Sequence, residues 1–372
     1  MKHEDWQGRL KRTVSAARKE GADAMLVTSP LNIRYLLGAG DALFALAGPG
    51  VAAVMPFALG CEVMKEKAPR GWKVLEPESS WNPLRKLLDR HRIRRLGMES
   101  ATMTVARHAE LRRALAAESV LVPVSGAVEG VREIKDAAEI AVMRRAGMVT
   151  RRVAEEMPSA IRAGVSEREI ASWIDRRMIE LGADGPAFDT IVLAAERSAL
   201  PHGRPTERRL KNGDFLLADF GARLDGYMTD ATRVFTAGRS DARQRRTYAA
   251  VFRASTAGRR GALPGRKAGE PDRAARLALG KLASKFIHTL GHGLGLEIHE
   301  GLRLAAGSKT RLRAGMAVTI EPGVYYPGWG GVRLEDTYIM TRSGPVSITG
   351  APAASLPAAG KGGLDGREGG KT

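Results

Sequence analysis

The fold of this chain is decided by two neighbouring stretches, Phe215–Gly221 (FLLADFG) and Gly226–Arg233 (GYMTDATR). In the first stretch an apolar run ends at Asp219, and the turn-prone Leu224-Asp225-Gly226 follows it. The second stretch then leads to Asp230. This pattern predicts a β-hairpin with one acid on each arm. Paired strands can bring two acids that are 11 positions apart to the same end of a sheet, although two ordinary turn aspartates would give the same pattern.

Histidines cluster farther along the chain. His288, His292 and His299 are three of the seven histidines, and His292 stands in the glycine-rich stretch Gly291–Gly295 (GHGLG). Glycines beside a histidine let the backbone approach another group closely. A single histidine is most often a structural residue, whereas three in one short segment indicate metal binding or proton transfer.

Two more acids end apolar, strand-like runs. Glu321 lies in Thr319–Gly323 (TIEPG), and Glu335 lies in Gly331–Asp336 (GVRLED). A carboxylate at the end of a buried strand is rarely left without a partner. Each motif alone is also compatible with a turn acid or with a surface Arg–Glu pair.

The four acids and one of the histidines form a recognisable ligand set. Carboxylates and imidazole suit divalent cations such as Mn, Fe, Co and Zn, and the lack of a thiolate argues against a structural zinc site. Two cations about 4 Å apart need bridging ligands, which carboxylates can provide. The pattern therefore predicts a hydrolytic dinuclear centre formed by Asp219, Asp230, His292, Glu321 and Glu335.

In this order the motifs resemble those of the pita-bread metallopeptidases, in the Xaa-Pro peptidase group of Xaa-Pro dipeptidases (prolidases) and Xaa-Pro aminopeptidases. All five metal-ligand motifs match, and Ser198–Gly203 (SALPHG) carries the family's substrate-side histidine. The resemblance spans about residues 22–356. Two features differ: the proline that often follows the His-Glu pair is replaced by Gly301, and the connection 276–286 is short.

The resemblance implies a role for each metal ligand. Asp219 would bind one metal ion, and His292 and Glu321 the other. Asp230 and Glu335 would bridge both ions. Either Glu321 or Glu335 would also act catalytically by moving the proton.

The resemblance also implies a substrate side. His202 and His299 would be catalytic and substrate-binding, because they would stabilise the oxyanion and steer the leaving amine. His288 would line the substrate pocket, and Arg303 would bind a substrate carboxylate in a bidentate contact. Arg333 would pair with Asp230 or Glu335 and orient it.

The implied reaction is hydrolysis of the Xaa-Pro peptide bond, in dipeptides or at the N-terminus of short peptides, by a hydroxide that bridges two divalent ions. Mn is the first choice of metal, and Co, Fe or Zn also fit. Dipeptidase and aminopeptidase both stay open. A methionine-type aminopeptidase is disfavoured by the N-terminal domain. A creatine-hydrolysing relative or a non-catalytic pita-bread binding module would be expected to lack part of the ligand set.

With 372 residues, of which 44% are hydrophobic, the chain is long enough for two domains with real cores. In residues 1–130, short apolar runs alternate with helical stretches, which predicts an α/β domain with a mixed sheet. The resemblance makes it a creatinase/prolidase N-terminal-like domain. Residues 131–358 are expected to form the α+β pita-bread catalytic domain, with a curved antiparallel sheet. The Gly-rich residues 359–372 are expected to form a disordered tail.

The net charge of +18 is spread along the chain, and basic residues do not alternate with aromatic ones, so no specific nucleic acid is expected as a partner. No segment is long and apolar enough for a membrane span. Met1–Trp6 has no apolar signal-peptide core. The single cysteine, Cys61, excludes an internal disulfide, so we expect a cytoplasmic protein. A homodimer is a separate expectation.

Overall fold

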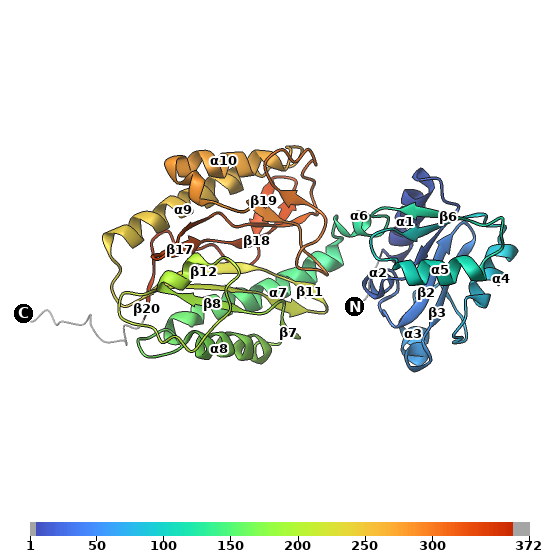
Figure 1. The fold of residues 1–372 in the computed structure, drawn as a ribbon, viewed down its shortest axis with the longest axis horizontal. Coiled ribbons are helices and arrows are strands. Elements are labelled where there is room, and N and C mark those ends of the chain that lie inside the picture. Colours follow the sequence, from blue (N-terminus) through green and yellow to red (C-terminus); the bar gives the residue numbers. More distant parts are fainter. Residues whose placement is uncertain (1–4, 360–372) are drawn as a thin grey trace, which may run out of the picture. The chain divides into compact units, whose positions relative to one another are not determined.

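The computed structural model describes residues 5–359, and the chain divides into two compact units, Met1–Arg132 and Glu133–Thr372 (Figure 1). Each unit has hydrophobic clusters of its own. Within residues 5–359, no helix is long and apolar enough to cross a membrane.

The first unit is built on a six-stranded sheet with strand order β4-β3-β2-β1-β5-β6. Its central strand β1 runs antiparallel to β2 and parallel to β5, so the predicted mixed sheet is confirmed. The strands are β1 (Ala24–Val27), β2 (Ala42–Gly48), β3 (Val51–Pro56), β4 (Lys73–Val74), β5 (Arg95–Glu99) and β6 (Val120–Val124). The helices are α1 (Trp6–Lys19), α2 (Pro30–Leu37), α3 (Cys61–Lys67), α4 (Asn82–Arg90), α5 (Val105–Ala114) and α6 (Glu129–Arg132), with the 3-10 turn η1 (Ala58–Gly60).

The second unit contains four long helices. They are α7 (Ala137–Glu156), α8 (Glu167–Glu180), α9 (Ala242–Gly261) and α10 (Gly269–Leu279). Three of them begin with a capping box, including α8, where Ser166 and Glu169 form it. Figure 1 shows α7 and α8 on one side of the strands, and α9 and α10 on the other.

The strands of the second unit form several small sheets. A four-stranded sheet has the order β20-β12-β9-β8, and a three-stranded sheet has the order β15-β18-β19. Most pairings are antiparallel; β12 and β20 are parallel. The strands are β7 (Gly185–Pro186), β8 (Ile191–Ala194), β9 (Phe215–Phe220), β10 (Ala222–Leu224), β11 (Tyr227–Met228), β12 (Ala231–Ala237), β13 (Gly291–His292), β14 (Arg303–Leu304), β15 (Ala317–Ile320), β16 (Gly323–Tyr326), β17 (Gly330–Arg333), β18 (Asp336–Thr341), β19 (Gly344–Ser347) and β20 (Ala358–Ala359), with 3-10 turns η2 (Met157–Ser159), η3 (Ala195–Ala199) and η4 (Gly280–Lys285).

Strands β9 and β12 separate two hydrophobic cores. Leu217 and Val234 belong to the core that also contains α9 and α10 residues, whereas Leu216 and Phe235 belong to the core with α7 and α8. Side chains alternate between the faces of a strand, so Asp219 points to the same face as Leu217. An acid therefore takes a position on a face that is otherwise apolar.

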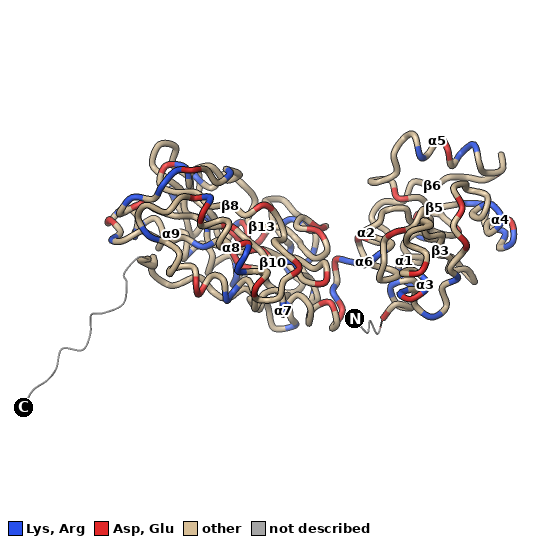
Figure 2. Tube along the Cα trace, turned by 90° about the horizontal axis from the view of Figure 1, so that it is seen from below, with Lys and Arg blue, Asp and Glu red and all other residues tan. Residues whose placement is uncertain are grey.

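The C-terminal end of the described chain belongs to the sheet. Ala359, which we expected to begin the disordered tail, pairs with Ala237 of β12. The other residues of the predicted tail, 360–372, lie outside the described residues. Lysine and arginine residues occur along both units, in agreement with the spread of charge along the sequence (Figure 2).

Gly221 lies in the first arm of the predicted hairpin, directly after β9, and faces the second arm. A Cβ atom at this position would lie 1.8 Å from the carbonyl oxygen of Thr229, so the two chains approach as closely as a glycine permits. This contact holds the segment that carries Asp230 against the end of β9.

We predict that Gly221→Ala destabilises the protein by about 1–3 kcal/mol, because the backbone must move to accept the methyl group. The displaced Asp230 segment should also weaken Mn²⁺ binding. The control is Gly130→Ala in helix α6, where a Cβ meets nothing within 4 Å. Thermal melts and Mn²⁺ titrations check both effects. Unchanged melting of Gly221→Ala would contradict the close packing of this hairpin.

Candidate metal centre

The two aspartates are placed by strand register. In the antiparallel pair β9–β12, Asp219 lies opposite Thr232, and Asp230 precedes Thr232 by two residues. Opposite residues, and residues two apart on a strand, share a face, so both carboxylates point the same way. The tight turn at Asp225 (φ 48°) and Gly226 (φ 79°) has the positive φ values that a two-residue hairpin requires. The predicted hairpin is confirmed.

His292 is held by its neighbours in an orientation that suits a metal ligand. Its backbone N–H donates to Thr319 Oγ1 at 3.1 Å, and its Nδ1 lies 3.1 Å from the Gly293 carbonyl oxygen. Because Nδ1–H donates to that carbonyl, the lone pair is on Nε2, which faces the acids. Burial, and then the charge of His299, lower the pKa of His292 to about 4. The ring is therefore neutral near pH 7.

The two glutamates lie at the ends of paired strands. Glu321 follows Ile320, whose strand partner Asp336 follows Glu335. Glu321 Oε1 accepts a hydrogen bond from Thr319 Oγ1 at 3.3 Å. Glu335 Oε2 accepts one from Thr232 Oγ1 at 2.6 Å. Strand pairing and threonine hydroxyls thus fix both carboxylates.

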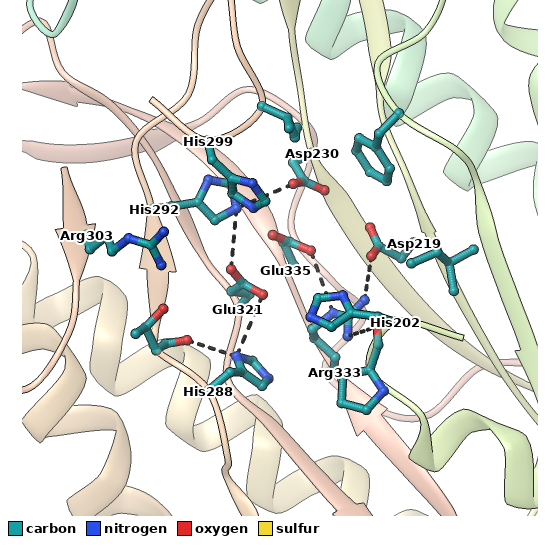
Figure 3. Close-up of a pocket in the computed structure, with 15 residues that line it drawn as sticks. His202, Asp219, Asp230, His288, His292, His299, Arg303, Glu321, Arg333 and Glu335 are labelled. Carbon is teal, nitrogen blue, oxygen red and sulfur yellow. Dashed lines mark hydrogen bonds and ion pairs between the residues drawn. The ribbon is translucent and has the colours of Figure 1, made fainter. Parts of the chain in front are cut away.

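The structure brings all ten predicted site residues to one cavity of about 340 Å³, a size that suits a small ligand. They are His202, Asp219, Asp230, His288, His292, His299, Arg303, Glu321, Arg333 and Glu335. Figure 3 shows the acids and His292 directed toward one another. His292 Nε2 lies 3.6 Å from Asp230 Oδ2 and 3.5 Å from Glu321 Oε1. Ligand atoms of Asp230, His292 and Glu335 all lie within 4.8 Å of one another. The individual roles of these residues remain predictions.

Burial makes the negative charges of this centre costly. Desolvation, followed by repulsion from Glu335 and Asp219, raises the pKa of Asp230 well above its usual range. Desolvation and the neighbouring acids have the same effect on Glu335. The pKa of Glu321 is raised to about 8, again mainly by burial. Divalent cations bound between these carboxylates would remove the repulsion.

The buried oxygens also fit cations. Asp219 Oδ1, Asp230 Oδ1 and Glu335 Oε1 are buried and have no hydrogen-bond partner in the described structure. A buried carboxylate oxygen without a donor is costly. Three such oxygens in one cavity, beside a neutral imidazole nitrogen, form the donor set that divalent metal ions prefer.

Arg333 pairs with Glu335, one of the two acids that we expected, and with Asp219 in addition. Its Nε lies 3.9 Å from Glu335 Oε2, and its guanidinium donates a hydrogen bond to Asp219. Thr232 lies opposite Asp219 and intervenes: Arg333 Nε donates to Thr232 Oγ1 at 2.9 Å, and that hydroxyl donates to Glu335. Arg333 thus orients Glu335 through a hydroxyl.

Tyr325 is a site residue that the sequence did not reveal. Its hydroxyl accepts a hydrogen bond from Arg333 at 3.1 Å and lies 2.8 Å from His288 Nε2. Burial, and then the charge of Arg333, lower the pKa of His288 to about 4, so the ring is neutral and its Nε2 accepts a hydrogen bond from the tyrosine hydroxyl. The only sequence feature that could have indicated Tyr325 is its place in Gly323–Tyr326, directly after Glu321-Pro322. Aromatic residues are typical of any strand, so this stretch does not by itself indicate a site residue.

The remaining predicted residues line the cavity from loops and strand ends. His202 and Arg303 are exposed, and His299 packs edge-on against His292, with ring centroids 4.4 Å apart. Burial and the charge of Arg303 lower the pKa of His299. Gly301, which stands where the resemblance led us to expect a proline after the His-Glu pair, has a φ of 61°. Proline cannot adopt this φ, so the backbone conformation explains why glycine occupies the position.

Comparisons with known proteins agree with this geometry. Residues 141–342 match the model of Metallopeptidase family M24, and residues 9–134 match the Creatinase/Prolidase N-terminal domain. The chain is 32% identical over 346 residues to an Xaa-Pro dipeptidase of Pyrococcus horikoshii, covering 92% of this chain and 96% of that protein. This chain belongs to Metallopeptidase family M24. It is a peptidase whose family implies divalent metal ions, and the pita-bread fold expected for it is confirmed.

Solved structures give the same result. An Xaa-Pro dipeptidase from Bacillus anthracis superposes with a TM-score of 0.90 at 34% identity, covering 95% of this chain and 99% of that one. An X-Pro aminopeptidase from Thermotoga maritima gives a TM-score of 0.85 at 27% identity, covering 93% of this chain and 100% of that one.

We predict that Mn²⁺ binds more tightly as pH rises from about 6 to about 8 and that its binding releases more protons at the lower pH, because carboxylates with raised pKa values hold protons that the ion must displace. The folded pKa of Glu321, about 8, lies above its ordinary 4.5, so the metal-free fold loses stability as pH rises between these values. The gain in Tm on adding Mn²⁺ should therefore be larger at the higher pH. Calorimetric titration in two buffers measures the protons released; affinity and Tm gain that do not vary with pH would contradict the prediction.

Proposed function

We propose that this protein hydrolyses the Xaa-Pro peptide bond, in dipeptides or at the N-terminus of short peptides, with two divalent metal ions of which Mn is the first candidate. The observation that carries the proposal is that four carboxylates and a neutral imidazole meet in one cavity. Three buried oxygens of these carboxylates have no hydrogen-bond donor in the described structure. Similarity to Xaa-Pro dipeptidases supports the substrate class.

The proposed ligands divide between two ions. Asp219 would hold one ion, His292 and Glu321 the other, and Asp230 and Glu335 would lie between them. When bound, such ions lower the pKa of water from 15.7 to about 7 and polarise the scissile carbonyl. Arg333 and Thr232 keep Asp219 and Glu335 oriented toward the cavity.

The protein's own groups would handle protons and the developing charge. Glu321 or Glu335 would carry the proton from the attacking water to the leaving amine. His299 and His202 line the same cavity and would donate to the oxyanion of the tetrahedral intermediate. His288 is tied to Tyr325 and would shape the substrate pocket.

Three apolar side chains beside the metal centre support a proline substrate. Phe188, Ile191 and Ile298 line the cavity and offer a surface for a prolyl ring. An Xaa-Pro bond is a tertiary amide without an N–H, so a site that recognises it must rely on ring contacts and on the carbonyl.

Arg303 favours dipeptides among the possible substrates. It lies opposite His292 in the β13–β14 pair, lines the cavity, and makes no ion pair within residues 5–359. A guanidinium without an acidic partner can bind a free carboxylate in a fork. In an Xaa-Pro dipeptide that carboxylate belongs to the proline itself.

An Xaa-Pro aminopeptidase is the second candidate, because the Thermotoga maritima structure covers nearly the whole chain. A Mn-loaded assay on Ala-Pro, Met-Pro and an Ala-Pro-Pro peptide separates the two activities. A non-catalytic binding module would contain no tightly bound metal when measured by mass spectrometry. A homodimer and a cytoplasmic location remain predictions.

The bridging assignment predicts the effect of removing one charge. Asp230→Asn and Glu335→Gln should each lower kcat by more than the roughly 100-fold that is typical for a group outside the ligand set, with the fold retained. The matched control is Asp225→Asn, in the exposed turn of the same hairpin. Rates, metal content and thermal melts check the prediction. Near-wild-type turnover of both variants would rule out the bridging roles.

The assignment of Arg303 predicts a substrate-dependent effect. Arg303→Ala should weaken cleavage of an Xaa-Pro dipeptide much more than cleavage of the same dipeptide amidated at its C-terminus, which has no carboxylate. Arg303→Lys keeps the charge but loses the fork, so it should lie between alanine and the wild type. The comparison uses kcat/KM on both substrates. Equal losses on both would assign Arg303 a structural role.

A further inference from the structure

The position of the His202 side chain is determined by the loop that carries it. The loop runs from Ala194, at the end of β8, through η3 to Thr206. Within residues 5–359, the His202 side chain makes no hydrogen bond or ion pair, and it is exposed at the cavity. Its position therefore depends on the backbone of the loop.

One buried carboxylate joins the two ends of this loop. The Glu167 side chain, at the start of α8, is fully buried. Its Oε1 accepts a hydrogen bond from the Ala194 backbone N–H at 2.8 Å. Its Oε2 accepts two from Thr206, the backbone N–H at 3.0 Å and the hydroxyl at 2.8 Å. Residues that are 12 positions apart thus meet at one side chain.

A second contact extends from the same carboxylate toward the histidine. Arg197, within η3, donates its Nε to Glu167 Oε2 at 3.0 Å. Its other end donates to the carbonyl oxygen of Arg204 at 2.8 Å, two residues from His202. The charge of Glu167 therefore holds both ends of the loop directly and its middle through a guanidinium. Charge-assisted bonds of this kind are among the strongest available to a buried network.

We propose that Glu167 is a positioning residue, which holds the loop closed so that His202 stays at the substrate side of the metal centre. The proposal rests on the proposed substrate role of His202. Glu167 does not line the cavity, so its effect on the reaction passes through the loop. The effect can be large, because a displacement of about 1 Å in a group that contacts the reacting atoms can cost about 100-fold in rate.

Glu167→Gln tests the anchor without an activity measurement. The amide keeps the size of the side chain, but its NH₂ group cannot accept the bonds that Thr206 and Arg197 donate. Amide hydrogen exchange should become faster in peptides that cover residues 195–206 and stay unchanged in β9. The matched control is Glu169→Gln, the same change in the first turn of α8, where glutamine still completes the capping box. Unchanged exchange in the loop would overturn the proposal.

A double-mutant cycle tests whether the anchor acts through the histidine. Glu167→Gln should lower kcat about 10- to 100-fold, with KM and metal content nearly unchanged. Glu167→Gln combined with His202→Ala should be no slower than His202→Ala alone. Losses that multiply would mean that Glu167 acts elsewhere, and a His202→Ala variant with full activity would overturn the proposal by removing the residue that the anchor serves.

Thr206→Val provides a second variant if Glu167→Gln does not fold. It removes one donor to Glu167 and should give a smaller loss in the same direction, again absent from the His202→Ala background. If the wild-type protein cleaves no Xaa-Pro substrate, the proposed function fails, and the exchange experiment still decides whether Glu167 closes the loop.

Discussion

The rest of this structure depends on the repulsion among four carboxylates, three of them buried and one partly buried. Asp219, Asp230, Glu321 and Glu335 line one cavity, where the buried guanidinium of Arg333 offsets only part of their charge. With all four ionised, three negative charges stay unbalanced. Folding alone therefore leaves an electrostatic cost at this place, which appears as raised carboxylate pKa values. Metal ions are the natural counter-charge, and the strands are arranged so that the acids cannot separate.

That arrangement explains why the ligands come from strand ends rather than from flexible loops. Asp219 is fixed by its register with Thr232, and Glu321 and Glu335 flank the pair Ile320–Asp336. Hydroxyl groups complete the support, because Thr232 donates to Glu335 and Thr319 donates to Glu321. Apolar cores lie on both faces of the central sheet and hold these registers. Hydrophobic packing around the carboxylates thus offsets the electrostatic repulsion among them.

Local motifs made much of the fold and site predictable. The hairpin, the capping box at Ser166 and the mixed sheet of the first unit follow from short-range patterns, and each is present. Strand β2 cannot be predicted from its own residues, because its alanines and leucines favour a helix and only pairing with the neighbouring strands makes this segment a strand. The contacts of Arg333 with Asp219 and Thr232 were not predicted for a related reason: strand register, which no single motif contains, places these two residues beside it. Tyr325 was missed because its contacts join three separate segments.

Paired strands position the predicted metal ligands, whereas loops and strand ends position the groups on the predicted substrate side of the cavity. The predicted metal ligands are buried, or partly buried in the case of Glu321, and belong to, or directly flank, paired strands. His202 and Arg303 are exposed, and His202 belongs to a loop closed by the side chain of Glu167. A change in loop length or conformation, such as the left-handed conformation at Gly301, can move groups on the predicted substrate side without altering the strand registers that position the predicted metal ligands. Substrate preference can therefore diverge between relatives while the metal centre stays constant, because the two are held by different parts of the same fold.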